Sequence, residues 1–213
     1  MEKKRQWLLT TTLFISLGLA ACGSQSVLSQ ADANTQTTTK TSTTSTTQTA
    51  SYFEASDLTA TYDESKASKI SLQGTTATVS GNGVTVSGST VEITKAGTYI
   101  VEGTATSVQL KVAAGKEDEV QIVFKNVTLK NTEAPVLVDT AKKVILTVAD
   151  GTKNEVADES TSTVKGAIYS DSDLTINGKG SLTVTGAASN AIKSKDGIRI
   201  VDATVTTTAK KHG

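Results

Sequence analysis

Apolar and polar residues alternate along most of the chain from about Ser56 onward. The stretch GVTVSGSTVEITKAGTYIVEG at 83–103 places Val, Ile, Thr and Tyr between glycines with a period of two residues. Such alternation predicts short β-strands that bury one face and expose the other, with turns at the glycines. No later segment has a sustained apolar period of 3.6 residues. We therefore expect an all-β protein with essentially no helix beyond its first residues.

Two stretches near the end nearly repeat each other. They are GAIYSDSDLTING at 166–178 and NAIKSKDGIRIVD at 190–202, so the first begins at Gly166 and the second at Asn190. Earlier segments fit the same scheme. The first strand of each repeating unit is expected to begin at Val120, Val144, Leu174 and Ile198. Repeats of this length indicate that each unit is one layer of a stack.

A layer of about 24 residues with two or three short strands matches one winding of a parallel β-helix. In such a stack, inward side chains lie on their equivalents in the windings above and below. One aliphatic column is expected to contain Ile122, Ile145, Ile176 and Ile200. Turns after the first strands are expected at Asn126, Asp150, Asn177 and Asp202.

An immunoglobulin-like β-sandwich is the competing fold, because it also has many short strands and frequent turns. It does not require self-similarity at the spacing seen here, so the repeat favours the β-helix. Residues 56–118 have a blurred repeat, and a small sandwich stays an alternative there.

The first 21 residues have the composition of an export signal. The charged EKKR precedes the apolar WLLTTTLFISLGLA, which is shorter than the roughly 20 residues of a comfortable membrane span. The following LAAC, at 19–22, is the pattern of a bacterial lipoprotein. Cleavage before Cys22 would leave its thiol free to carry a diacylglyceryl group. We predict a signal peptide at 1–21 and a lipid anchor at Cys22, which would hold the protein on the extracellular face of the bacterial cell membrane. An ordinary signal peptide with a chance cysteine is the alternative.

A Ser/Thr-rich segment follows the anchor. Thirteen of the seventeen residues from Thr35 to Ser51 are Ser or Thr, so this segment has little apolar area to bury. We predict a disordered tether at 22–55 and a folded domain at 56–213. The last winding stops part-way, so the chain is expected to be a fragment of a longer protein.

Composition excludes several kinds of site. The chain has 213 residues with one Cys, one His and a formal net charge of zero. A single cysteine forms no internal disulfide or thiolate cluster, and a single histidine forms no His-rich zinc site. Balanced charge provides no basic field for nucleic acid, which we do not expect as a partner.

Three segments and the terminal His-Gly resemble a known family. The segments are TVADGTKNEV (147–156), AIYSDSDLTINGKGSLTVTG (167–186) and NAIKSKDGIRIVDATVTTTA (190–209). They resemble bacterial carbohydrate-binding lipoproteins whose domain is a right-handed parallel β-helix similar to pectate lyases. Over residues 56–213, the resemblance implies a secreted, surface-anchored protein that binds acidic polysaccharide such as polygalacturonate, carries calcium and has no demonstrated lyase activity.

An anionic polysaccharide requires cations, and sugar rings also pack on aromatic side chains. Aromatic residues make up only 4% of the chain, and Tyr169 is the candidate platform. Lys193, Lys195 and Arg199 are the candidate carbohydrate-binding cations, because equivalent positions of successive windings form a line along which a sugar chain can lie. The larger pool of basic residues for such a line also contains Lys142, Lys143, Lys165, Lys210 and Lys211. For each of them, a merely solubilising surface charge is the alternative.

Acidic residues near the same windings suggest a calcium site. Calcium takes six to eight oxygen ligands at about 2.3–2.6 Å. Asp171 and Asp173 lie in one bend, and Asp196 of the next winding falls close to them in the repeat. We predict these three residues as calcium ligands; aspartates that cap turns are the alternative. The resembling family often has Asp-Asp where this chain has Asp196 followed by Gly197, which weakens the site.

The sequence favours binding over catalysis. A lyase needs a positioned base to abstract a proton, and neither Lys193, Lys195 nor Arg199 is singled out for that task. We expect a monomeric, lipid-anchored, non-catalytic protein that binds acidic polysaccharide with the help of calcium. Two alternatives are an envelope adhesin or structural module without glycan binding, and a polysaccharide lyase.

Overall fold

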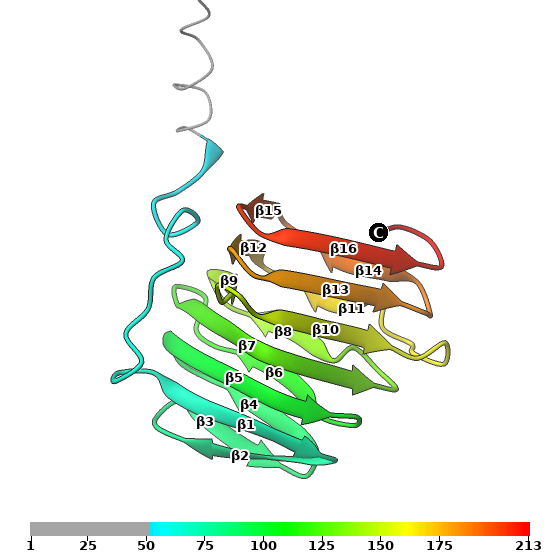
Figure 1. The fold of residues 1–213 in the computed structure, drawn as a ribbon, viewed down its shortest axis with the longest axis horizontal. Coiled ribbons are helices and arrows are strands. Elements are labelled where there is room, and N and C mark those ends of the chain that lie inside the picture. Colours follow the sequence, from blue (N-terminus) through cyan, green and yellow to red (C-terminus); the bar gives the residue numbers. More distant parts are fainter. Residues whose placement is uncertain (1–51) are drawn as a thin grey trace, which may run out of the picture. The chain divides into compact units, whose positions relative to one another are not determined.

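The computed structural model describes residues 52–213, and the regular elements it gives there are all β-strands, as the alternation predicts (Figure 1). Among these residues no helix has the length and apolarity needed to cross a membrane. The predicted signal peptide, Cys22 and the tether up to residue 51 lie outside the described part of the chain.

The strands form two sheets. In the ten-stranded sheet A, seven strands follow one another in the order β15-β12-β9-β7-β10-β13-β16, and β1, β2 and β5 join off this path. Its strands are β1 (Ser68–Gly74), β2 (Thr76–Ser80), β5 (Gly97–Ala105), β7 (Glu119–Asn131), β9 (Lys143–Val148), β10 (Lys153–Asp158), β12 (Asp173–Gly178), β13 (Ser181–Gly186), β15 (Ile198–Val201) and β16 (Thr204–Ala209). The six-stranded sheet B has the order β14-β11-β8-β6-β4-β3. Its strands are β3 (Val84–Ser87), β4 (Thr90–Ile93), β6 (Gln109–Ala113), β8 (Val136–Thr140), β11 (Gly166–Ser170) and β14 (Asn190–Ser194).

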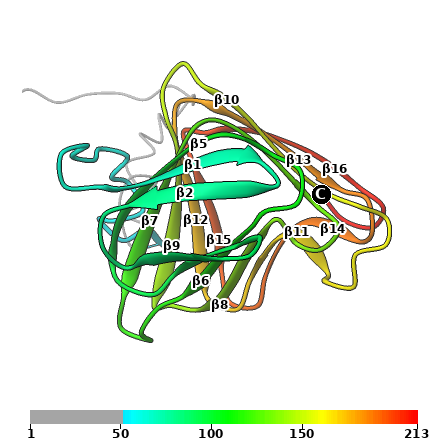
Figure 2. The same cartoon turned by 90° about the horizontal axis from the view of Figure 1, so that it is seen from below.

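Strand pairing from β7 to β16 is parallel, and it joins each strand to its equivalent in the next repeat. Val120 pairs with Val144, Val144 with Leu174, and Leu174 with Ile198, which are the four strand starts that the sequence predicts. The chain therefore winds repeatedly through both sheets, and each winding lies on the one before it (Figure 2). A sandwich of antiparallel sheets would not produce these pairs.

The near-repeat at the end of the sequence has a direct structural counterpart. Ile168 of β11 pairs with Ile192 of β14, and Leu174 of β12 pairs with Ile198 of β15. Both pairs have the same separation in sequence as the starts of the two stretches, Gly166 and Asn190. The two stretches thus occupy the same positions in consecutive windings.

The first strands explain why the repeat is blurred before residue 118. β1 pairs with β2, and β3 with β4, in antiparallel fashion. β1 then pairs in parallel with β5, and β4 with β6, so this part belongs to the same two sheets. The separate small sandwich that was an alternative for this region is not formed.

One aliphatic column inside the stack differs by a residue from the prediction. Ile122 pairs with Leu146, Leu146 with Ile176, and Ile176 with Ile200. Ile145 was expected in this column, but it pairs with Gln121 and lies on the outward side of β9. The run Val-Ile-Leu in β9 is apolar on both sides, so alternation alone did not fix which residues point inward.

Turn and stacking residues follow the prediction in part. Asp150 lies in a turn after β9, and Asp202, with a φ of 59°, lies in a bend after β15, as predicted. Asn126 also has a positive φ, of 56°, but it lies within β7, where the pairing with β5 shifts register. Asn177 instead lies within β12, and the turn falls at Gly178, whose φ is 104°. Buried Asn154 links windings, because its Oδ1 accepts a hydrogen bond from Val127 N at 2.8 Å.

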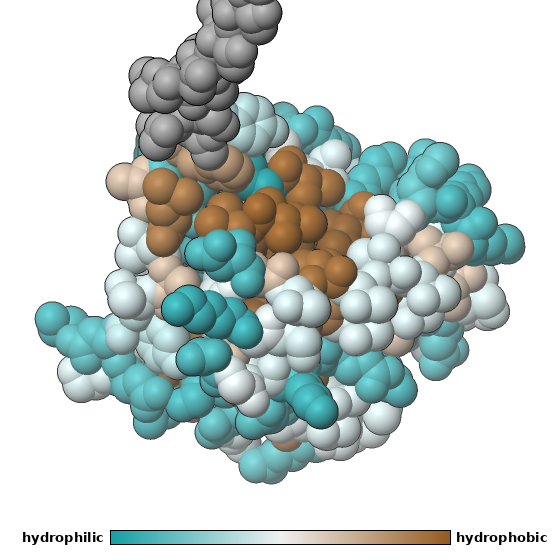
Figure 3. Space-filling model, turned by 45° about the horizontal axis from the view of Figure 1, so that its top comes forward, coloured by the Kyte–Doolittle hydropathy of each residue, from teal (hydrophilic) through white to brown (hydrophobic). Residues whose placement is uncertain are grey.

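The apolar columns reach the surface at the last winding. Ile198 is 39% exposed and Ile200 is 47% exposed, although Leu174 and Ile176, their partners in β12, are buried. Figure 3 shows the apolar surface that results.

Candidate functional site

A groove of about 440 Å³ lies on the outward face of sheet B. Its lining residues are Leu137, Thr163, Val164, Lys165, Tyr169, Lys193 and Lys195. Three of the four residues that the sequence predicts for carbohydrate binding, Tyr169, Lys193 and Lys195, therefore share one site. The groove also contains Lys165, a member of the larger basic pool.

Strand register aligns the groove along the stack. Tyr169 of β11 pairs with Leu137 of β8 on one side and with Lys193 of β14 on the other. Ile168 and Ser170 are buried, so the alternation of β11 turns Tyr169 outward. Neighbouring strands lie about 4.8 Å apart, so the three outward side chains form a short line across three windings.

Contacts from neighbouring windings fix the groove's wall. The Glu133 carboxylate accepts hydrogen bonds from the backbone nitrogens of Thr163 and Val164, at 3.0 and 3.3 Å. Burial raises the pKa of Glu133, but these hydrogen bonds outweigh it, and the pKa lies below its usual value. Asn190 donates a hydrogen bond to the carbonyl oxygen of Lys165 at 2.6 Å. The loop before β11 is thereby attached to the windings on both sides.

Lys195 lies against the aromatic ring of the groove. Its Nζ is 5.9 Å from the centroid of the Tyr169 ring and 2.7 Å from Asp171 Oδ2. The hydrogen bond with Asp171 raises the pKa of Lys195 and lowers that of Asp171, so both groups are charged near neutral pH. Asp171 Oδ1 is buried and has no hydrogen-bond partner among the described residues.

The other two predicted calcium ligands do not join Asp171. Asp173 Oδ1 accepts hydrogen bonds from Gly197 N at 3.0 Å and from Arg199 Nη1 at 3.1 Å. Asp196 is exposed, and its backbone nitrogen bonds Ser194 Oγ at 3.2 Å. Within residues 52–213, no group of three or more His, Cys, Asp and Glu side chains is arranged to hold a metal ion.

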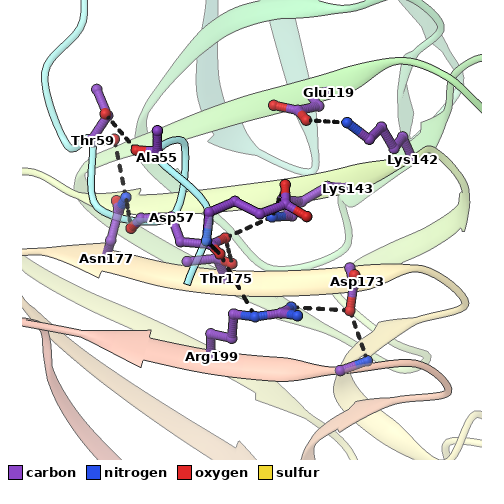
Figure 4. A network of polar contacts seen from close by, with 12 residues as sticks. Ala55, Asp57, Thr59, Glu119, Lys142, Lys143, Asp173, Thr175, Asn177 and Arg199 are labelled. Atoms are coloured by element: carbon purple, nitrogen blue, oxygen red, sulfur yellow. Dashed lines mark hydrogen bonds and ion pairs between the residues drawn. The ribbon is translucent and has the colours of Figure 1, made fainter. Parts of the chain in front are cut away.

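Arg199 belongs to a different site on sheet A. Its guanidinium contacts Asp173, and its Nε lies 3.6 Å from Asp57 Oδ2 (Figure 4). It also lies over the Tyr52 ring, with Cζ 5.5 Å from the ring centroid. The prediction that Arg199 shares a line with Lys193 and Lys195 is wrong, because β14 and β15 belong to different sheets.

The centre of this second site is a buried ion pair. Lys143 Nζ lies 2.9 Å from Asp57 Oδ1, and the two side chains are 1% and 0% exposed. Thr175 donates a further hydrogen bond to the same oxygen, and Glu54 Oε2 lies 2.9 Å from Lys143 Nζ. Burial alone would raise the pKa of Asp57, but the hydrogen bonds from Thr175 and Lys143 outweigh it and lower the pKa.

Asp57 and Glu54 belong to residues 52–62, which we call the strap. The sequence prediction placed 22–55 in the tether, yet contacts with sheet A already begin at Tyr52, whose carbonyl oxygen accepts a hydrogen bond from Arg199 at 3.4 Å. The prediction missed the strap, although one signal was present. Apart from Lys143, the residues of β9 are apolar or short on both sides, as expected of a strand covered on both faces, and all six residues are buried.

The groove's residues fall within a segment shared with known proteins. A family model described as "Carbohydrate-binding domain-containing protein" matches residues 87–213, which is more than half of the chain. This chain belongs to that family. The family's segment includes Tyr169 and the lysines of the groove.

Two relatives extend this finding. A carbohydrate-binding domain-containing protein of Acetivibrio thermocellus is 35% identical over 128 residues, which cover 56% of this chain and 45% of the relative. The chain thus spans less than half of that relative's length. A solved structure described as the polysaccharide lyase-like protein from C. thermocellum, in a gadolinium derivative, is similar with a TM-score of 0.65 and 32% identity. That match covers 67% of this chain and 62% of the other.

Proposed function

We propose that this protein binds acidic polysaccharide, such as pectin or polygalacturonate, in the groove of β8, β11 and β14. The observation that carries the proposal is the alignment of Tyr169 with three lysines in a single groove. Membership in a carbohydrate-binding family supports the sugar ligand, and the lysines support its negative charge.

The groove offers both contacts that an acidic sugar needs. The Tyr169 ring provides a flat apolar surface for the C–H face of a sugar ring. Lys165 and Lys193 form no ion pair within the described residues and are available to uronate carboxylates. Lys195 is held beside the ring by Asp171 and adds a third cation. A sugar chain running across the three strands would meet these groups in turn.

Binding without catalysis fits the chemistry of the basic residues. Lyase activity is the second candidate, since the similar solved structure is described as polysaccharide lyase-like. A lyase base must be partly deprotonated. The hydrogen bond with Asp173 raises the pKa of Arg199, and that with Asp171 raises the pKa of Lys195, so both favour the protonated form. We therefore propose a non-catalytic binding protein.

Calcium assistance stays a prediction from the sequence. Calcium requires six to eight oxygens. Asp171 and Asp173 are each paired with a cation, and Asp171 Oδ1 is the one buried oxygen of the predicted ligands that lacks a partner in the described chain. This donor set does not fit a calcium ion. The groove proposal accordingly rests on Tyr169 and the lysines.

The finer architecture and location are further parts of the proposal. Parallel pairing of each winding with the next supports a right-handed parallel β-helix similar to that of pectate lyases. The lipoprotein pattern at Cys22 supports anchoring to the extracellular face of the bacterial cell membrane, and we propose that the protein is a monomer. An envelope adhesin that binds no glycan is the alternative.

A glycan array with and without a calcium chelator tests the function. We expect signals on polygalacturonate and other uronate-containing glycans, little signal on neutral glucans, and no loss when the chelator is present. No glycan signal in either condition would reject the proposal in favour of an adhesin. A signal that disappears with the chelator would show that calcium is required for binding.

A further inference from the structure

The strap crosses the outward face of sheet A along the direction in which the windings stack. Its contacts reach four neighbouring strands of the sheet, β15, β12, β9 and β7. The side-chain donors are Arg199 to Tyr52 O (3.4 Å), Asn177 to Asp57 O and Thr59 O (3.1 Å each), Lys143 to Glu54 Oε2 (2.9 Å) and Gln121 to Thr61 O (3.5 Å). The strap, which makes a turn at residues 55–58, therefore contacts the stack from β15 to β7.

A carboxylate of the strap occupies a site built by three windings. Lys143 of β9, Thr175 of β12 and Arg199 of β15 all approach the Asp57 carboxylate (Figure 4). Thr175 and Arg199 are register partners, and Lys143 and Thr175 are fully buried. An ammonium, a hydroxyl and a guanidinium around one carboxylate form a site for a carboxylate in general.

Open space adjoins the strap at both ends of these strands. A cavity of about 390 Å³ lies between strap residues 56–61 and the beginnings of β5, β7 and β9, where Gln121 and Ile145 line it. A second, of about 350 Å³, lies between strap residues 60–62 and the ends of β9 and β12. The strap thus runs through a trough that has room for a wider chain.

The strap is not part of the sheet. Within the described chain, its backbone–backbone hydrogen bonds are internal, from Asp57 N to Glu54 O at 3.1 Å and from Thr59 N to Ser56 O at 3.2 Å. No strand pairing would be broken if it moved away. The donors of Gln121 and Asn177 would then be free for the hydroxyl groups of a sugar.

We propose that the trough under the strap is a second carboxylate-binding site, and that the strap is its built-in occupant, which an acidic polysaccharide displaces. The ligand class rests on the proposed function, but the site uses none of the groove's residues. Asp57 takes the place of a uronate carboxylate. The strap thereby keeps the trough closed until a ligand with several carboxylates competes for Lys143, Thr175 and Arg199.

The test measures binding of trigalacturonate to the full chain by calorimetry. The starting protein carries Tyr169→Ala and Lys193→Ala, which weaken binding in the groove. Adding Asp57→Ala should raise the affinity at least tenfold, and adding Lys143→Met to that variant should abolish the gain. Asp63→Ala is the matched control, because Asp63 is an exposed aspartate just beyond the strap, paired with Lys66. It should leave the affinity unchanged.

If Asp57→Ala, added to the starting protein, leaves it folded but does not raise its affinity for trigalacturonate, the proposal is overturned. If wild-type protein then still binds through Tyr169 and Lys193, the proposed function stands alone. If only the Asp57→Ala variant binds, the groove proposal fails and the trough proposal stands. Should Asp57→Ala unfold the protein, hydrogen exchange on wild type decides: saturating trigalacturonate should accelerate exchange of the Asp57 and Thr59 amides severalfold. Unchanged exchange would overturn the proposal.

Discussion

In the proposed function, single residues of the groove act through two different physical effects. The Tyr169 ring would remove apolar sugar surface from water, whereas Lys193 would compensate the charge of a uronate. Tyr169 and Lys193 are both partly buried in the free protein, so they lose less side-chain freedom on binding than fully exposed residues would. The aromatic term is insensitive to salt and the ionic term is screened by it.

Substitution of these two residues should separate the effects. Covering roughly 50 Å² of ring at about 25 cal/mol per Å² is worth about 1.3 kcal/mol, so Tyr169→Ala should weaken binding of polygalacturonate close to tenfold. Lys193→Ala removes one exposed ionic contact, worth up to about 1 kcal/mol, and should weaken binding up to about fivefold. Calorimetry at low and high salt measures both. Lys69→Ala, at an exposed lysine of β1, should change nothing; an equal loss there would mean that only general charge matters.

The buried pair of Asp57 and Lys143 contributes to stability in another way. Removing one partner leaves an uncompensated charge in a site without water, which lowers the free energy of unfolding by about 3–5 kcal/mol. The strap can lift and let water reach Lys143, so Asp57→Ala should cost near the lower end, about 3 kcal/mol. Urea unfolding measures the loss. Asp63→Ala, at an exposed carboxylate paired with Lys66 and hydrogen-bonded by Ser65, should lower the free energy of unfolding far less, and a loss equal to that of Asp57→Ala would contradict the role of burial.

The sequence predicted which residues are neighbours where the two near-repeats align. Tyr169 and Lys193 stand at the same position of the two near-repeats, so the sequence placed them together. Arg199 follows Lys193 closely in sequence, yet the chain turns into the other sheet between them. The cation partners of Asp171 and Asp173 were missed, because a repeat shows which positions are adjacent but not which charged side chains of neighbouring windings pair.

At the scale of elements, the strap covers an outward face of β9 and β12 that is suited to being covered. β9 and β12 present small or apolar outward residues, such as Ile145, Thr147 and Thr175, which would be poorly suited to an open face. The Ser/Thr-rich composition before residue 52 concealed where ordered contacts begin. Asp57 and Thr175 lie far apart in the chain, and no local pattern predicts a contact at that separation.

The attachment of the strap should depend on pH. The pKa of Asp57 lies below its ordinary value in the folded protein, so its carboxylate stabilises the fold above the unfolded pKa of about 3.9 and loses this effect as pH falls through the folded pKa. Thermal midpoints of wild type and Asp57→Asn, measured from about pH 7 to about pH 2.5, should therefore converge below about pH 4. A difference that stays constant over this range would contradict the account. The pKa of Lys143 is raised, so the pair should persist to alkaline pH.

At the scale of the whole molecule, the stacking was the most predictable feature. The strand starts Val120, Val144, Leu174 and Ile198 gave the register directly, because each winding must bury its inner face on the next. The antiparallel start of the stack was not predictable, since no later strands repeat the antiparallel pairing of β1 with β2 and of β3 with β4.

The predicted anchor should decide where the protein is found. If Cys22 carries a diacylglyceryl group, wild type should sediment with bacterial membranes, and Cys22→Ser should move the protein to the soluble or secreted fraction. Fractionation followed by immunoblotting measures this. Cys22 is the only cysteine of the chain, so Ser24→Ala serves as the neighbouring control. Membrane association of Cys22→Ser equal to wild type would contradict lipid anchoring.

The most direct measurement is a crystal structure of the protein with a galacturonate oligosaccharide. The account predicts a sugar ring packed on Tyr169 and a carboxylate within hydrogen-bond distance of Lys165 or Lys193. An oligosaccharide bound elsewhere, with the Tyr169 ring uncovered, would contradict it.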